Sequence, residues 1–157
     1  MNITLIMIGK TNEDFVRTGV KMYLDRLRHY IACKEIIIPD IKDRKNYSPE
    51  QIKTKEAALI LDKIPDNAYT ILLDESGTEY TSVGFSTLLQ KHMNSGIKEL
   101  VFIIGGAYGV DRSVSERAGS VLSLSKMTFT HLFVRLILAE QLYRSMTILK
   151  NEPYHNS

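Results

Sequence analysis

The sequence has only one cysteine, Cys33, no tryptophan and four prolines among its 157 residues. A single cysteine excludes an intramolecular disulfide bond, so the fold must depend on its core. No apolar run approaches the roughly 20 residues that cross a bilayer, because Glu140 and Arg144 interrupt the most apolar segment. The N-terminus also lacks the basic start and small-residue cleavage site of a secretory signal. We therefore expect a cytoplasmic protein with no membrane partner.

Metal-ligand spacing is missing as well. The histidines, at positions 29, 92, 131 and 155, form no pattern with one another or with Cys33 that would predict a zinc site. We therefore expect no metal. The formal net charge of +2 and the pI of about 8.6 permit a nucleic-acid partner but do not require one.

Two glycine-containing segments resemble nucleotide-binding motifs without completing them. "IGKT" at 8–11 would need a glycine where Thr4 stands to be a P-loop. "GGAYG" at 105–109 would need one at Ile104 to be a dinucleotide fingerprint. These glycines still allow a backbone to approach a ligand closely at the carboxyl end of a strand. An ordinary turn is the alternative interpretation of "GGAYG".

Apolar periodicity predicts an α/β protein. With 44% hydrophobic residues and this length, we expect one domain over residues 1–157. Continuous apolar runs predict buried strands at 3–9, 35–39, 69–74, 100–106 and 121–125. Helical patterns lie between them, at 16–31, after a capping box at Ser48, at 82–94, after an Asp111 cap, and at 131–150. This alternation indicates a mainly parallel sheet with helices on both faces.

The last predicted helix, 131–150, has an apolar surface wider than one stripe. Part of that surface could meet a second subunit, or the helix could be sunk between its own sheet and neighbouring helices. On the first helix, Arg17, Lys21 and Arg28 share one side. A solvated helix face and an RNA contact are both compatible with that stripe.

Two segments carry residues unusual for their positions. "LSKMTFTH" at 124–131 leaves a predicted buried strand without the glycine or proline of a tight turn, which suggests a functional segment. The closing "EPYHNS" places Tyr154 and His155 on a short tail, where fraying is the usual alternative.

These two segments, together with "LLDESG" and "FIIGGAYG", resemble the RlmH family along the whole chain. Its members are SPOUT-class methyltransferases that modify a pseudouridine of large-subunit ribosomal RNA. The resemblance implies a C-terminal deep trefoil knot, S-adenosylmethionine as the cofactor and a homodimer paired through the knotted region. It also implies methylation of N3 of a pseudouridine in 23S ribosomal RNA, on the assembled ribosome. A ribosome-associated RNA-binding module with a degenerate cofactor pocket is the alternative.

The same resemblance assigns residues. It implies a cofactor cleft lined by Leu73, Gly105, Leu124, Ser125, Lys126, Met127, Thr128 and Phe129. It also points to Arg144, Tyr154 and His155 as catalytic residues. Arg144 is expected to stabilise the developing imide anion, His155 to assist proton removal and Tyr154 to stack on or orient the base. Because Arg144 lies one helical turn after Glu140, a structural ion pair is its alternative role.

Overall fold

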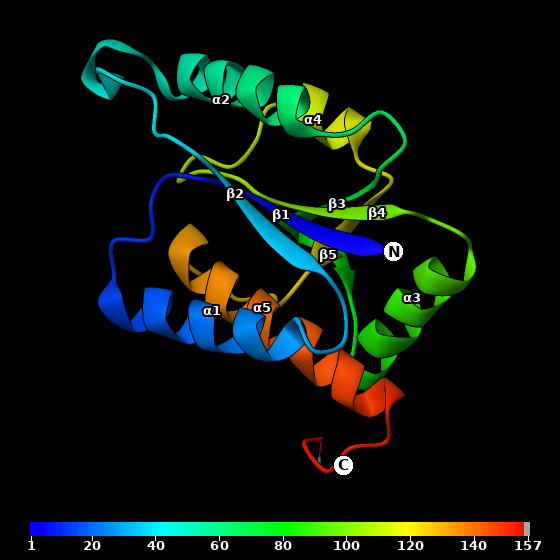
Figure 1. Ribbon diagram of the computed structural model, residues 1–157. Coiled ribbons are helices and arrows are strands. Elements are labelled where there is room, and N and C mark those ends of the chain that lie inside the picture. Colours follow the sequence, from blue (N-terminus) through cyan, green and yellow to red (C-terminus); the bar gives the residue numbers. More distant parts are fainter. Residues whose placement is uncertain (156–157) are drawn as a thin grey trace.

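The computed structural model describes residues 1–155 and contains one parallel sheet with strand order β2-β1-β4-β3-β5 (Figure 1). The strands are β1 (Asn2–Ile8), β2 (Cys33–Ile38), β3 (Tyr69–Glu79), β4 (Glu99–Ile104) and β5 (Ser120–Ser123). All five predicted strands are therefore present, and the parallel α/β class is confirmed. Residues 156 and 157, which the one-domain expectation also includes, lie outside the described part of the chain.

The helices occupy the predicted places. They are α1 (Asp14–Leu27), η1 (Arg44–Asn46), α2 (Pro49–Lys63), α3 (Ser82–Asn94), α4 (Arg112–Arg117) and α5 (His131–Leu149). The predicted capping box is present, because Ser48 accepts from the Gln51 amide while the Gln51 side chain accepts from the Ser48 amide. Asp111 caps α4 as expected. Helix α1 ends at Leu27, earlier than the predicted 31. Ile31 fitted the apolar pattern of the helix because it is also buried in the core, but it lies beyond the turn that follows α1.

Helices cover both faces of the sheet, and each face has its own apolar core (Figure 1). Helices α1, α3 and α5 pack on the face that carries Leu5 and Phe102. Helices α2 and α4 pack on the face that carries Ile6 and Ile103. Neighbouring residues of one strand thus point into different cores, which is why the strands are continuous apolar runs rather than alternating ones. In residues 1–155, no helix combines the length and apolarity needed to cross a membrane.

Strand β3 is interrupted by an arch, residues 74–77. Leu73 and Thr78 both pair with Leu122 of β5, so the four residues between them leave the ladder. A Cβ atom on Gly77 would lie 2.7 Å from the backbone of Val121 and Leu122. The arch therefore lies directly against β5, and only glycine allows that approach. The predicted strand 69–74 was too short because its second half resumes after this irregularity. The deep trefoil knot implied by the resemblance stays a prediction.

Candidate active site

A cavity of about 1270 Å³ opens at the carboxyl ends of β4 and β5, beside the arch of β3. Parallel α/β sheets bind ligands at this edge. The arch, the turn after Ile104, the exit loop 124–130 and the first turn of α5 surround the cavity, and Glu13, Phe15 and Val16 at the start of α1 complete the wall. Its volume exceeds the roughly 300–1,000 Å³ of ordinary small-molecule pockets, so a cofactor and part of a substrate could share it.

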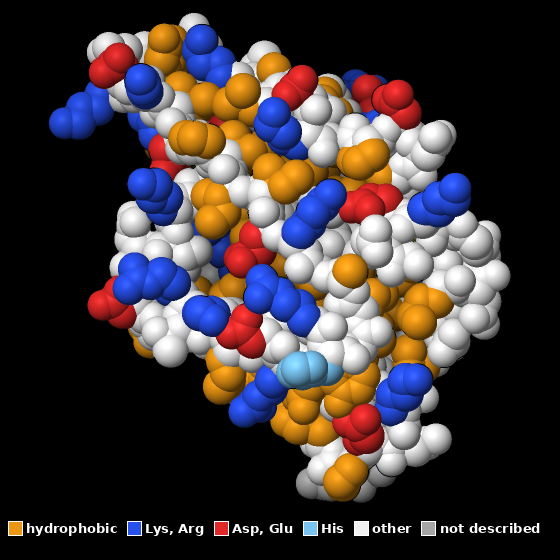
Figure 2. Space-filling view, viewed as in Figure 1, with side chains coloured by type: hydrophobic (Ala, Val, Ile, Leu, Met, Phe, Trp, Pro, Cys, Tyr) orange, Lys and Arg blue, Asp and Glu red, His pale blue; other side chains and the backbone are white. Residues whose placement is uncertain are grey.

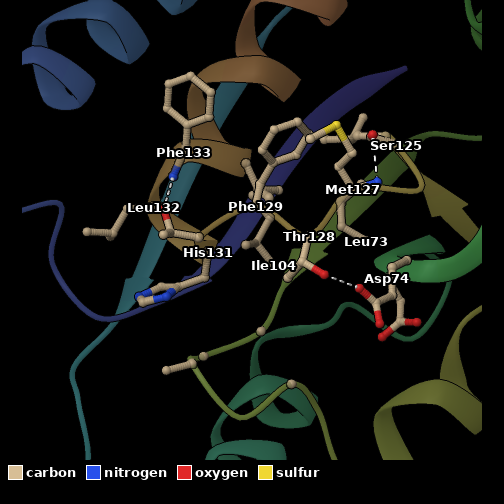
Figure 3. Close-up of a pocket in the computed structure, with 18 of the residues that line it drawn as sticks. Leu73, Asp74, Ile104, Ser125, Met127, Thr128, Phe129, His131, Leu132 and Phe133 are labelled. Carbon is tan, nitrogen blue, oxygen red and sulfur yellow. Dashed lines mark hydrogen bonds between the residues drawn. The ribbon is translucent and has the colours of Figure 1, made fainter.

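The structure brings the predicted cleft residues together. Seven of the eight line the cavity: Leu73, Gly105, Leu124, Ser125, Met127, Thr128 and Phe129. Figure 3 shows Leu73, just before the arch of β3, and Ile104, at the end of the adjacent β4, facing the same space as Thr128 and Phe129 from the exit loop. The exception is Lys126, whose exposed side chain points to Glu79 at 3.9 Å and does not line the wall.

Side-chain hydroxyls shape the exit loop that the sequence left without glycine or proline. Ser123 donates to the carbonyl of Ser125 at 3.0 Å, and the Ser125 hydroxyl accepts from the Met127 amide at 2.9 Å. Thr128 donates to Glu75 of the arch at 2.8 Å, the bond drawn beside Asp74 in Figure 3. Thr130 then caps α5 by accepting from the Phe133 amide. These hydrogen bonds stabilise the turns of a loop that contains no glycine or proline.

The glycine turn is packed too tightly for larger residues at two positions. A Cβ on Gly105 would lie 2.7 Å from Val110, and one on Gly106 would lie 2.7 Å from the Glu56 carboxylate. Glu56 is only 2% exposed, and within residues 1–155 neither of its carboxylate oxygens has a hydrogen-bond partner. Arg44 lies 3.9 Å from it. Burial raises the pKa of Glu56, although the positive charge of Arg44 opposes that change.

Replacing Glu56 with glutamine should therefore stabilise the protein at pH 8. A carboxyl whose pKa is raised by folding contributes stability below its unfolded pKa and loses it as the pH rises through the folded value. The melting temperature of Glu56→Gln should exceed that of the wild type at pH 8, and the difference should shrink toward pH 5. Glu50→Gln, on an exposed part of the same helix, is the control. A Glu56→Gln protein that melts lower than the wild type at pH 8 would show that the Arg44 contact outweighs the burial cost.

The three predicted catalytic residues form a second cluster near the end of α5. Arg144 Nη1 lies 3.4 Å from His155 Nδ1, and the Arg144 guanidinium carbon lies 4.7 Å from the centre of the Tyr154 ring. Tyr154 donates to Glu140 at 3.1 Å. Tyr154 and His155 are therefore docked on the protein, contrary to the alternative that the tail frays there. The alternative contact of Arg144 is also present, because its Nε donates to Glu140 at 2.9 Å.

The ionisation of this cluster favours a charged arginine and a neutral tyrosine. The hydrogen bond to Glu140 raises the pKa of Arg144. Burial raises the pKa of Tyr154, and its hydrogen bonds to Tyr23 and Glu140 act in the same direction. A fixed cation next to an imidazole suits the stabilisation of an anion that forms as a proton leaves.

The cavity and the catalytic cluster lie at opposite ends of α5. His131 lines the cavity, whereas Arg144 is about 20 Å farther along the helix at roughly 1.5 Å per residue. Within one chain, the predicted catalytic residues thus do not reach the predicted cofactor cleft.

Several site residues were not singled out from the sequence. Glu75, in the arch, accepts a hydrogen bond from the Thr128 hydroxyl of the exit loop. Arg135 is fully buried and donates to the carbonyl of Gly9 and to the Thr11 hydroxyl, at 2.9 and 2.8 Å. It also donates to the carbonyl of Ile8, so it fixes the chain where β1 ends. Contacts over more than 120 residues of sequence leave no local pattern that could have shown them.

The basic stripe on α1 is largely neutralised. Arg17 pairs with Asp14, and Lys21 and Arg28 both pair with Asp25. Basic and acidic side chains are correspondingly mixed over this face of the molecule (Figure 2). These pairs favour the solvated helix face over a dedicated RNA contact.

The cavity residues fit S-adenosylmethionine. Adenine and a methionine moiety require apolar walls and backbone donors and acceptors. Leu73, Ile104, Leu124 and Phe129 supply the walls, and the backbone of the Gly105 turn and of the exit loop can supply the polar contacts. The carboxylates of Asp74 and Glu75 suit a cationic sulfonium.

The fold and the cavity are therefore those of a cofactor-binding α/β enzyme, and comparison with known proteins gives its family. The family model described as "Predicted SPOUT methyltransferase" matches residues 1–155. A protein of Flavobacterium psychrophilum named ribosomal RNA large subunit methyltransferase H is 54% identical over 99% of both chains. One of the same name from Christiangramia forsetii is 51% identical, again over 99% of both.

The chain belongs to the SPOUT methyltransferases, within the family of ribosomal RNA large subunit methyltransferase H. The resemblance seen in the sequence is thus confirmed, and S-adenosylmethionine is the methyl donor of this enzyme. A probable methyltransferase from Bordetella pertussis has a similar fold, with a TM-score of 0.55 at 11% identity over 92% of this chain and 94% of that one.

Proposed function

We propose that this enzyme methylates N3 of a pseudouridine in 23S ribosomal RNA, on the assembled ribosome and in the cytoplasm. The chain is similar over its full length to large-subunit ribosomal RNA methyltransferases, and its cavity fits the cofactor; together these observations support the proposal. The modest net charge of +2 favours an assembled ribosome, because the substrate's shape must then supply recognition that charge cannot.

The cavity residues hold the cofactor and exclude water from it. Leu73, Gly105 and the exit loop 124–129 would contact it, with Lys126 contributing its backbone rather than its outward side chain. When bound, S-adenosylmethionine supplies an electrophilic methyl group on a sulfonium. Most of the rate enhancement should come from holding the attacking nitrogen close to the methyl group and in line with the bond that joins this methyl to sulfur.

The catalytic cluster acts on the target base. N3 of pseudouridine must lose its proton, and negative charge then develops on the neighbouring carbonyl oxygens. His155 accepts the proton, Arg144 stabilises the charge, and Tyr154 orients or stacks on the base. The 3.4 Å contact between Arg144 and His155 supports this division of work.

A homodimer would reconcile the two separated halves of the site. In each subunit the tail and the cavity lie at opposite ends of α5. In a dimer, the tail of one subunit could face the cavity of the other. Apolar side chains around the cavity mouth support a covering subunit, because Phe15, Met127 and Phe133 are 62, 72 and 37% exposed. Part of the wide apolar surface of α5, including Leu138 and Leu142, is buried within its own chain.

Mass spectrometry of 23S ribosomal RNA from a strain lacking the protein tests the reaction. The account predicts that one methylated pseudouridine disappears and returns when the protein is restored. Purified enzyme should then methylate intact ribosomes from that strain and leave isolated ribosomal RNA largely unmodified. Equal methylation of both substrates would remove the assembled ribosome from the proposal, and an unchanged modification pattern in the strain would contradict the reaction.

A further inference from the structure

The C-terminal tail is tied to the end of α1 by a contact that the proposed chemistry does not use. The Tyr30 hydroxyl, in the turn after α1, donates to the Glu152 carboxylate. This contact joins residues 122 positions apart in the sequence. The hydrogen bond to Glu152 raises the pKa of Tyr30 to about 12, as expected for a hydroxyl that donates to a carboxylate.

The tail adopts a defined conformation where this contact holds it. Asn151 takes a left-handed backbone conformation with φ of 54°, which ends α5. The Glu152 amide donates to the carbonyl of Thr147, and the Tyr154 amide donates to the carbonyl of Glu152, both at 2.9 Å. Glu152 is thus fixed by its backbone to α5 and by its side chain to Tyr30.

Four tyrosines pack around this attachment. The ring of Tyr143, on α5, lies 4.8 Å from that of Tyr154, 6.0 Å from that of Tyr30 and 6.1 Å from that of Tyr23, measured between centroids. The Tyr154 hydroxyl lies 3.4 Å from that of Tyr23. Aromatic pairs at such separations add stabilisation beyond area burial. Helix α1 therefore forms part of the surface on which Tyr154 rests.

We propose that Tyr30 and Glu152 form a latch that positions the catalytic tail for methyl transfer. This inference rests on the proposed function, because it gives the tail residues Tyr154 and His155 their task. A free terminus samples many conformations, and each productive encounter would have to select one of them. A latched tail keeps His155 beside Arg144 before the substrate arrives, so less conformational entropy is lost in reaching the transition state. Tyr30 and Glu152 are positioning residues, since neither has to touch the base.

Digestion with a carboxypeptidase measures the latch independently of catalysis. Tyr30→Phe removes the hydrogen bond and keeps the ring, so His155 and Tyr154 should be released about 3- to 10-fold faster than from the wild type. The same variant should lower kcat on ribosomes by a similar factor, with an unchanged Kd for S-adenosylmethionine. Tyr80→Phe, which changes a tyrosine that is 45% exposed and outside the cluster, is the matched control.

Variants of Glu152 complete the test. Glu152→Gln keeps an acceptor for Tyr30, so its kcat and its rate of trimming by the carboxypeptidase should stay close to those of the wild type. Glu152→Ala removes the acceptor and should behave like Tyr30→Phe. The double variant Tyr30→Phe with Glu152→Ala should be no worse than either single one, because both remove the same contact. Wild-type kcat in Tyr30→Phe, or unchanged trimming, would overturn the latch. Faster trimming of the variants in a protein that methylates no ribosome would instead overturn the proposed function and leave the docking intact.

Discussion

Replacing Arg144 with alanine is expected to lower kcat for methyl transfer about 100- to 1,000-fold, the usual effect of removing a group that stabilises transition-state charge. Arg144 lies 3.4 Å from His155 and its guanidinium carbon lies 4.7 Å from the centre of the Tyr154 ring, so it is a fixed cation beside the proposed proton acceptor. Because Arg144 is assigned to the base and not to the cofactor, the calorimetric Kd for S-adenosylmethionine should stay unchanged. Single-turnover methylation of ribosomes would measure the chemical step.

The chain offers a matched control for the loss of an ion pair. Arg112 pairs with Glu116 at 2.7 Å with the same one-turn spacing as Arg144 and Glu140, but it is exposed on α4. Arg112→Ala should retain normal methyl transfer. If Arg144→Ala also retained it while melting at a lower temperature, the ion pair with Glu140 would be the whole role of Arg144.

Replacing Gly77 with alanine is expected to lower the melting temperature by about 3–10 °C, from an overpacking cost of roughly 1–3 kcal/mol. The new methyl group would lie 2.7 Å from the backbone of Val121 and Leu122, which cannot move as a flexible side chain can. Displacing the arch should also disturb the contact between Glu75 and Thr128. The Kd for S-adenosylmethionine should therefore rise roughly 10-fold or more.

Gly84→Ala separates this effect from the general cost of replacing a glycine. Its Cβ would lie 3.2 Å from the Thr81 hydroxyl, which caps α3 by accepting from the Gly84 amide, so it would crowd a side chain and not the backbone, and alanine favours the helical conformation there. Gly84→Ala should keep the wild-type cofactor affinity and melting temperature or melt slightly higher. Wild-type cofactor affinity in Gly77→Ala would show that the arch does not shape the cavity.

Local patterns in the sequence were sufficient to predict most of the fold. Apolar runs identified all five strands, and the Ser48 and Asp111 caps identified the starts of α2 and α4. The strand order and the arch could not be predicted in this way. Nothing local to "DESG" shows that Gly77 packs on β5, because that contact depends on a segment more than 40 residues later.

The candidate site was predicted more by resemblance than by physical pattern. Ser125 and Thr128 lie on the cavity wall as the family motif implies, whereas the side chain of Lys126 points away from it. Buried polar groups were the hardest to foresee. No local pattern in the sequence marks Glu56 or Arg135 as buried, and only the folded chain places them beside Gly106 and Gly9. Their positions depend on tertiary packing, which periodicity does not encode.

Methyl transfer by this protein requires that the cavity between the Gly105 turn and the Ser125 exit loop bind the methyl donor. Calorimetric titration of the purified protein with S-adenosylmethionine, without RNA, tests this most directly. The account predicts saturable binding to the wild type and at least about tenfold weaker binding to Gly77→Ala. No binding by the folded wild type, together with RNA binding that ignores the cofactor, would contradict it and favour a ribosome-associated RNA-binding module.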